Sequence, residues 1–298
     1  MIIYVGWQHF SLRFIGLGLA VLIVSSCGIP LPGDVRQSLG EVHENIIDFQ
    51  EIEFFIERAA SAYDDHDKIQ ADYPNLVHVT TLAANDLQYF IQADVVSASQ
   101  TIAIRGTAGR ANLLEDLEIA LVPDEILGLR IHRGFRDDAT AIFKDAVRFL
   151  DKDTPVRVTG HSLGGAIAAI LAAYLDEAGY RVERVMTFGQ PRFSTQSVSK
   201  KVVAVTTRVV NGTDVVPMVP PYSLFTPYRH HGAEVILLPE KEFVYLDQHE
   251  ADRVALGEFW RELDKLSLDL HSIDAYVGNI QFKVGAGAQQ IAYLSSSS

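Results

Sequence analysis

The sequence has one cysteine, no excess of basic residues and no internal repeat. Cys27 has no second cysteine to pair with, so a disulfide within the chain and a cysteine-rich metal site are both excluded. Lys and Arg number 25 against 38 Asp and Glu, a formal net charge of −13, so no basic surface for nucleic acid is expected. No period of about 20–50 residues recurs, which argues against solenoids and propellers. The 298 residues, 48% of them hydrophobic, are enough for one substantial core.

The lone cysteine follows an apolar segment near the start of the chain. Residues 14–24 read FIGLGLAVLIV and come directly after Arg13. This run is shorter than the roughly 20 residues of a membrane-spanning helix, but it is typical of the core of a signal peptide. The next residues, Val24-Ser25-Ser26-Cys27, resemble a bacterial lipobox, in which the thiol is acylated and the chain is cut just before it. We therefore expect residues 1–26 to be a signal peptide and Cys27 to be the site of lipid attachment.

The residue after the expected cleavage site suggests a location. Gly28 follows Cys27, and by resemblance to lipoproteins this favours the outer membrane of a bacterial cell envelope. The alternative is an ordinary secretory signal with an incidental cysteine, which would give a periplasmic or secreted protein. The Pro- and Gly-containing residues 27–43 are expected to tether the anchor to the folded domain.

Helical and strand patterns alternate along the rest of the chain. This alternation predicts an α/β fold with a central, mostly parallel sheet flanked by helices. We expect one domain over 44–282 and a loose tail over 283–298, which consists mainly of GAGAQQIAYLSSSS. The expected helices are 44–66, 132–150 and 248–269, and the expected strands are 86–96, 100–106, 156–159, 182–188, 202–210 and 234–238.

A serine between two glycines is the strongest chemical feature. Ser162 lies in VRVTGHSLGGAIAAI, where a strand pattern precedes it and a helix rich in small residues follows. Gly160 and Gly164 permit a sharp strand-to-helix turn that exposes the serine hydroxyl, and the N–H groups at the start of the helix point toward a developing negative charge. Because glycines also occur in structural turns, Ser162 needs partners before it can be interpreted as a nucleophile.

The required partners occur downstream in the order Ser, Asp, His. Asp214 follows an expected strand, although the NGTD segment around it is also typical of a plain turn. Four histidines come after it: His230, His231, His249 and His271. His271 is favoured as the base, because it follows the late helix and opens a segment, HSIDAYVGNI, that we expect to be a loop able to reach the top of the sheet.

Several blocks of sequence, in order, resemble the class 3 lipase family of α/β-hydrolases. The blocks are IAIRGT, IHRGF, VTGHSLGGA, TFGQPR, RVVNGTDVVPMVPP, YRHHGAEV and HSIDAY, and they extend over roughly residues 75–280. The resemblance implies an α/β-hydrolase fold with a short lid and a catalytic triad of Ser162, Asp214 and His271. It also implies an oxyanion hole formed by Thr107 and the backbone N–H of Leu163, and it places the apolar face of the lid at Leu113, Leu114 and Leu117.

The implied reaction is hydrolysis of a carboxylic ester through an acyl-enzyme, without a cofactor or a metal. The expected substrate is a lipid, either a triacylglycerol or a phospholipid cut as by an A1-type phospholipase. One alternative is an esterase for soluble or feruloyl esters, and an acyltransferase would use the same acyl-enzyme. A catalytically silent, surface-anchored binding lipoprotein is an alternative of a different class. The sequence gives no indication of oligomeric state.

Overall fold

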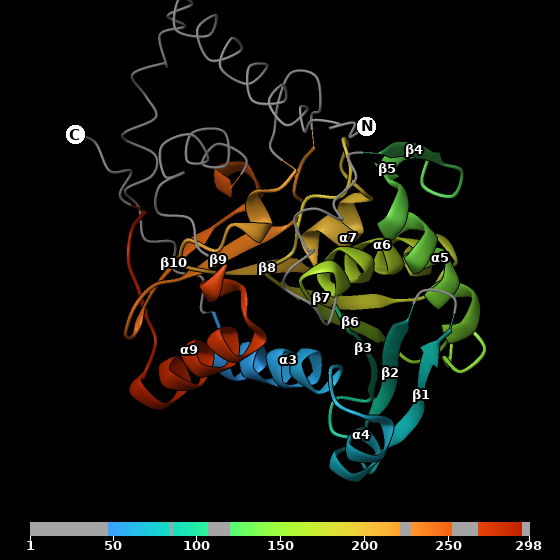
Figure 1. Ribbon diagram of the computed structural model, residues 1–298, viewed down its shortest axis with the longest axis horizontal. Coiled ribbons are helices and arrows are strands. Elements are labelled where there is room, and N and C mark those ends of the chain that lie inside the picture. Colours follow the sequence, from blue (N-terminus) through green and yellow to red (C-terminus); the bar gives the residue numbers. More distant parts are fainter. Residues whose placement is uncertain (1–46, 84–85, 107–119, 221–227, 252–267, 294–298) are drawn as a thin grey trace, which may run out of the picture. The chain divides into compact units, whose positions relative to one another are not determined.

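The central part of the fold is a single large sheet. The computed structural model describes residues 47–83, 86–106, 120–220, 228–251 and 268–293. Within them, nine strands pair in the order β1-β2-β3-β6-β7-β8-β9-β10-β11 (Figure 1). Five neighbouring strands are parallel, which confirms the predicted α/β architecture with a mostly parallel central sheet; they are β3 (Ser99–Ile104), β6 (Val156–His161), β7 (Val182–Phe188), β8 (Thr206–Asn211) and β9 (Ala233–Leu237).

Antiparallel strands extend this sheet on both sides, and at one edge β11 pairs parallel with β10. The strands predicted over 86–96 and 100–106 are present as β2 (Leu87–Asp94) and β3, which pair antiparallel. Patterning of the sequence did not identify the other strands outside the parallel centre, which are short or lie at edges where one face meets solvent. These are β1 (Leu76–Leu82), β10 (Glu242–Leu246), β11 (Gln289–Gln290), and a separate two-stranded sheet of β4 (Leu121–Asp124) and β5 (Leu129–His132).

Helices cover both faces of the sheet. One face carries α5 (Arg133–Ala146), α6 (Leu163–Glu177) and the short α7 (Lys200–Ala204), and the other carries α3 (Phe49–Ser61) and α9 (Ile273–Ala286) (Figure 1). A further helix, α4 (His66–Asp72), follows α3.

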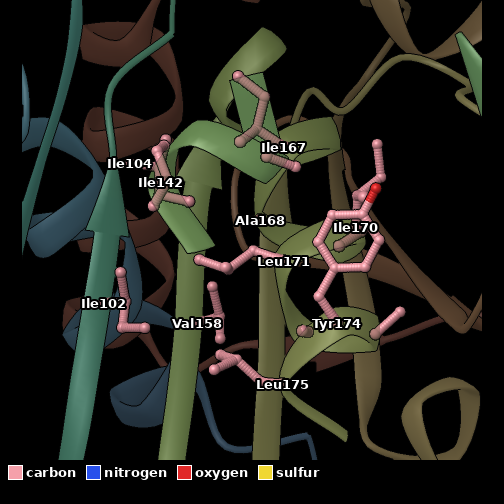
Figure 2. Packing of buried hydrophobic residues seen from close by; sticks show 14 of the residues in the cluster. Ile102, Ile104, Ile142, Val158, Ile167, Ala168, Ile170, Leu171, Tyr174 and Leu175 are labelled. Carbon is pink, nitrogen blue, oxygen red and sulfur yellow. The ribbon is translucent and has the colours of Figure 1, made fainter. Parts of the chain in front are cut away.

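Helix α6 is buried along nearly its whole length, because it lies between the sheet and α5. A helix that is hydrophobic all round is expected in such a position. Leu171 and Leu175 pack against Val158 of β6, and the helix also meets Ile142 of α5 (Figure 2). This packing fixes the start of α6, where Ser162 lies, relative to the strands.

Some predicted helices and strands have different bounds. The helix expected over 44–66 is α3, which begins after the capping Asp48 and ends at Ser61. The strand expected over 202–210 is wrong in its first half, because Ser199 caps the short helix α7 and β8 begins only at Thr206. Of the helix expected over 248–269, residues 248–251 are helical, 252–267 lie outside the described residues, and Asp269–His271 form a 3-10 turn.

The prediction of a loop after His271 is also wrong. Ser272 accepts a hydrogen bond from the Ala275 N–H and so caps α9, whose Tyr276 and Ile280 are buried against the sheet. The expected loose tail is therefore ordered over its first part. Residues 283–286 belong to α9, and Gln289 and Gln290 form β11, which pairs with Glu242 and Phe243 through backbone hydrogen bonds that leave no periodic pattern in the sequence.

Candidate active site

Ser162 occupies a strained turn at the end of a central strand. It lies between β6 and α6 with φ 59° and ψ −131°. A positive φ in a residue that has a Cβ costs on the order of 1–3 kcal/mol, so surrounding contacts must hold it. One such contact is the Ser162 N–H, which donates to the carbonyl oxygen of Phe188 in β7 at 2.8 Å. The turn sets the serine side chain at the carboxyl edge of the parallel strands.

The two glycines around Ser162 permit close backbone approach. A Cβ on Gly160 would lie 2.4 Å from the carbonyl oxygen of Gly164. A Cβ on Gly164 would in turn lie 2.4 Å from the carbonyl oxygen of Ile104 in β3. Real Cβ atoms do not come this close to backbone atoms, so both positions require glycine for packing of the helix start against the strands.

Ser162, His271 and Asp214 form one chain of hydrogen bonds. The Nε2 atom of His271 lies 2.8 Å from Ser162 Oγ, and its Nδ1 atom lies 2.8 Å from Asp214 Oδ2. A carboxylate only accepts, so Nδ1 carries the proton and Nε2 accepts from the serine hydroxyl. All three side chains are buried, at 3%, 5% and 0% exposure for Ser162, His271 and Asp214. The structure thus brings together the three residues that the sequence singled out.

Three donors converge on the carboxylate of Asp214. Besides the His271 ring, the Val216 N–H donates to Oδ1 at 2.9 Å and the Tyr276 hydroxyl donates to Oδ2 at 2.7 Å. Burial and the neighbouring Asp214 charge hold the pKa of Tyr276 well above its usual value, so this hydroxyl stays protonated and remains a donor. The aspartate is therefore fixed in position for its bond to the imidazole.

Sequence reasoning did not assign a role to Tyr276 or Asn211. The Tyr276 oxygen accepts the backbone N–H of Asn211 at 3.0 Å, and the Asn211 side chain donates to the carbonyl oxygen of Leu270 at 3.1 Å. Asn211 thereby ties the end of β8 to the residue before His271. The blocks RVVNGTD and HSIDAY contain both residues, but their contact depends on α9 being a helix, which the pattern did not predict.

Gly189 leaves room for the histidine ring. Its φ is +57°, and a Cβ there would lie 2.8 Å from His271 Cε1, 2.9 Å from His271 Nδ1 and 3.0 Å from Asp214 Oδ2. This glycine belongs to the TFGQPR block at the end of β7. Both its backbone conformation and the space around it require glycine.

The residue after the serine begins a helix. Leu163 is the first residue of α6, and the first N–H groups of a helix have no acceptor within it, so its N–H is free of intrahelical bonding. Other residues assigned from the sequence lie outside the described residues: Thr107, Leu113, Leu114 and Leu117 in 107–119, and Cys27 in 1–46. Their expected roles stay predictions.

The other three late histidines do not bond to Ser162. The Nε2 atom of His230 lies 2.6 Å from the carbonyl oxygen of Pro217, and that of His231 lies 2.7 Å from Ser194 Oγ. Both side chains are buried, and burial together with nearby arginines lowers the pKa of each. His249 is exposed in the helical residues 248–251.

Two features are absent from the part of the chain that the structure describes. Within the described ranges, no group of three or more His, Cys, Asp or Glu side chains is arranged to hold a metal ion. Within the same ranges, no helix is long and apolar enough to cross a membrane.

Comparison of the sequence with known families and proteins points to lipases. The family model for lipase (class 3) matches residues 101–224. A secreted mono- and diacylglycerol lipase of Fusarium solani is 30% identical over 155 residues, which are 49% of this chain and 46% of that protein. A lipase of Rhizomucor miehei is 33% identical over 147 residues, or 45% of this chain and 40% of that protein. The matched segment therefore spans less than half the length of these curated relatives.

Solved structures share the fold. The Rhizomucor miehei lipase in complex with its propeptide aligns with a TM-score of 0.56 and 25% identity, covering 70% of this chain and 77% of that one. Lipase II from Rhizopus niveus aligns with a TM-score of 0.57 and 22% identity, covering 64% of this chain and 81% of that one.

The parallel sheet, the strained serine after a central strand and the helix that follows it define an α/β-hydrolase. Within that superfamily, the chain is similar to the class 3 lipase family, whose model matches residues 101–224.

Proposed function

We propose that this protein is a serine carboxylic ester hydrolase of the lipase type. The observation that carries the proposal is the continuous chain of hydrogen bonds from Ser162 Oγ through His271 to Asp214, at 2.8 Å for each bond, on a strained turn of the hydrolase fold. A serine hydroxyl becomes an effective nucleophile when a base is within such reach and a third group orients that base. The match of residues 101–224 to the family model for lipase (class 3) supports the same reaction.

The reaction follows from the positions of these groups. The His271 Nε2 atom takes the proton of Ser162 as Oγ attacks the ester carbonyl, and Asp214 stabilises the imidazolium that forms. The tetrahedral intermediate collapses to an acyl-enzyme, and His271 gives its proton to the departing alcohol. Water, activated by the same imidazole, then releases the acid and restores Ser162.

The negative charge that develops on the ester oxygen needs donors. The Leu163 N–H at the start of α6 is suited to one of these roles, and the positive end of the helix dipole adds to it. We assign the second role to Thr107, which follows Gly106 in the sequence. Removal of one such donor typically raises the barrier by about 3–4 kcal/mol.

We infer a lipid ester as the substrate. The Fusarium solani relative is named as a mono- and diacylglycerol lipase, which supports a glycerol ester of fatty acids. We propose that the apolar face of a lid that meets the lipid is formed by Leu113, Leu114 and Leu117. The esterase and phospholipase alternatives differ from this proposal only in the shape and polarity of the substrate site.

The experiment is a comparison of wild type with Ser162→Ala on p-nitrophenyl butyrate, followed by a panel of tributyrin, triolein, phosphatidylcholine and methyl ferulate. We expect Ser162→Ala to remain folded and to lose activity on every ester. Hydrolysis of the glycerides above the feruloyl ester supports the lipase assignment, whereas a preference for methyl ferulate would overturn it. Wild-type activity in Ser162→Ala would overturn the nucleophile itself.

We further propose that the chain is a lipoprotein of the bacterial cell envelope, anchored in the outer membrane through acylated Cys27. The apolar residues 14–24 and the lipobox-like Val24-Ser25-Ser26-Cys27 support this proposal. Cells fed radiolabelled palmitate should label the wild type and not Cys27→Ser. Equal labelling of both proteins would contradict the anchor, and unlabelled protein in the medium would favour secretion.

A further inference from the structure

His161, the residue before Ser162, makes two hydrogen bonds. The chemistry of the groups determines which atom donates in each. Its Nε2 atom lies 2.8 Å from the backbone carbonyl oxygen of His271. A carbonyl oxygen only accepts, so Nε2 of His161 carries a proton. The other ring nitrogen, Nδ1, lies 2.9 Å from the Tyr63 hydroxyl. In the neutral ring Nδ1 is an acceptor, so the tyrosine donates to it.

Tyr63 extends this chain of hydrogen bonds to Gly106, in the segment that follows β3. It lies in the turn after α3, and its oxygen accepts the backbone N–H of Gly106. A Cβ on Gly106 would lie 2.5 Å from that oxygen, so the backbone and the hydroxyl are in close contact. Burial raises the pKa of Tyr63, which keeps the hydroxyl protonated and able to donate.

The network therefore joins three segments that are distant in the sequence. It runs from Gly106 N–H to Tyr63, from Tyr63 O–H to His161, and from His161 N–H to the His271 backbone. Gly106 precedes Thr107, the expected oxyanion residue, and His161 precedes Ser162. Every donor along this path has an acceptor, so the network is satisfied without a charged group.

The His161 ring also supports the His271 ring directly. The two imidazoles stack with centroids 4.7 Å apart and an interplanar angle of 30°. Tyr276, which bonds to Asp214, meets the His161 ring edge-on at 5.5 Å. His161 thus contacts both the base and the tyrosine that holds its aspartate.

We propose that Tyr63 and His161 are positioning residues, which hold the backbone of Gly106 and of His271 in fixed places around Ser162. This inference rests on the proposed function, because it concerns the oxyanion donor and the base of that reaction. Displacing either by about 1 Å can cost roughly 100-fold in rate, so a positioning network of this kind affects turnover without touching substrate.

The test compares Tyr63→Phe with Tyr89→Phe. Tyr89 is buried, and its hydroxyl donates to Asp145 of α5 at 2.6 Å. Tyr89→Phe therefore also removes one hydrogen-bonded tyrosine hydroxyl, but one that makes no bond to the site. We expect both variants to lose thermal stability. Only Tyr63→Phe should lower kcat on p-nitrophenyl butyrate, by about 10- to 100-fold with KM unchanged, and slow the phosphonylation of Ser162 by a fluorophosphonate to the same degree.

A second pair of variants tests the bond to His271. His161→Gln keeps an N–H donor near the position of Nε2, whereas His161→Leu has none, so the glutamine variant should retain more kcat than the leucine variant at equal folding. If Tyr63→Phe does not fold, the two His161 variants still test the positioning role. Equal kcat in Tyr63→Phe, Tyr89→Phe and wild type, or equal kcat in the two His161 variants, would overturn the positioning role. Residual activity of Ser162→Ala on the same ester would instead overturn the proposed function.

Discussion

His271 Nε2 lies 2.8 Å from Ser162 Oγ across 109 positions of sequence. The contact depends on two separate features. The strained turn presents the serine, and the capped start of α9 with the Asn211–Leu270 bond fixes the backbone next to the histidine.

Replacement of His271 should have a far larger effect than replacement of the exposed His249. His271→Ala removes the base that bonds to Ser162, and loss of such a base typically lowers kcat at least about 1,000-fold. His249→Ala should keep wild-type kcat, because the side chain is exposed in residues 248–251. The measurement is the initial rate of each variant on a soluble ester. A larger loss of kcat in His249→Ala than in His271→Ala would contradict the assignment of the base.

Gly189→Ala should cause a large loss of kcat and only a small loss of stability. The added methyl would lie 2.8 Å from His271 Cε1, so the ring must move away from Ser162, and we expect kcat to fall by about 100-fold or more. Gly179→Ala is the matched control. It also has a positive φ, +82°, but its methyl would meet only the flexible Lys152 side chain at 3.7 Å.

Both glycine variants should lose about 1–2 kcal/mol of stability from the strained backbone. Only Gly189→Ala should lose activity, as measured by kcat beside a urea titration of each protein. If Gly179→Ala loses activity to the same extent, the effect comes from strain and not from the space needed by His271.

Tyr276→Phe should destabilise the protein and reduce turnover. It removes a donor to Asp214 and leaves the Asn211 N–H without its acceptor, so we expect the free energy of unfolding to fall by about 1–3 kcal/mol. The control is Tyr228→Phe, since the Tyr228 hydroxyl is buried with no hydrogen-bond partner among the residues that the structure describes. That variant should be neutral or slightly more stable. Equal losses in the two variants would show that the bond to Asp214 contributes nothing.

Stability should fall in mild acid, partly because of His231. Burial, followed by Arg208 and Arg229, lowers the pKa of His231 to about 3, below the ordinary value of 6.5. Between these values the unfolded chain binds a proton that the folded protein does not, so the free energy of unfolding decreases as pH falls below about 6.5. The slope from this one group is about 1.4 kcal/mol per pH unit, and above pH 7 the group has no effect.

His231→Gln should make that dependence shallower by about one proton. The measurement is urea unfolding at pH 7.5, 6.0 and 5.0 for wild type, His231→Gln and the exposed His249→Gln. We expect the wild type and His249→Gln to share one slope. A parallel slope in His231→Gln would mean that His231 is protonated in the folded protein.

Much of the site could be predicted because its residues carry local patterns. Ser162 lies between glycines after a strand and before a helix, and Asp214 follows a strand, so the local pattern and chain order gave two members. The position of His271 after the expected late helix favoured it over the other three late histidines. Tyr276, Gly189 and the Tyr63–His161 pair could not be assigned in this way. Their importance arises from contacts between segments up to 110 positions apart, which no local pattern encodes.

The errors in the fold have a similar cause. Residues 200–204 and 273–286 are helical because Ser199 and Ser272 cap them and because their apolar residues meet the sheet. Read alone, the β-branched residues of 200–204 favoured a strand. The polar start of 273–286 favoured a loop. Tertiary packing decided against local propensity in both.

The central claim is that Ser162 is the activated nucleophile. It is tested most directly by incubating the full chain with a fluorophosphonate and locating the adduct by peptide mass spectrometry, with Ser162→Ala in parallel. We predict one adduct per chain, on Ser162, and none in the variant. An adduct on another residue, or the same labelling in Ser162→Ala, would contradict the account.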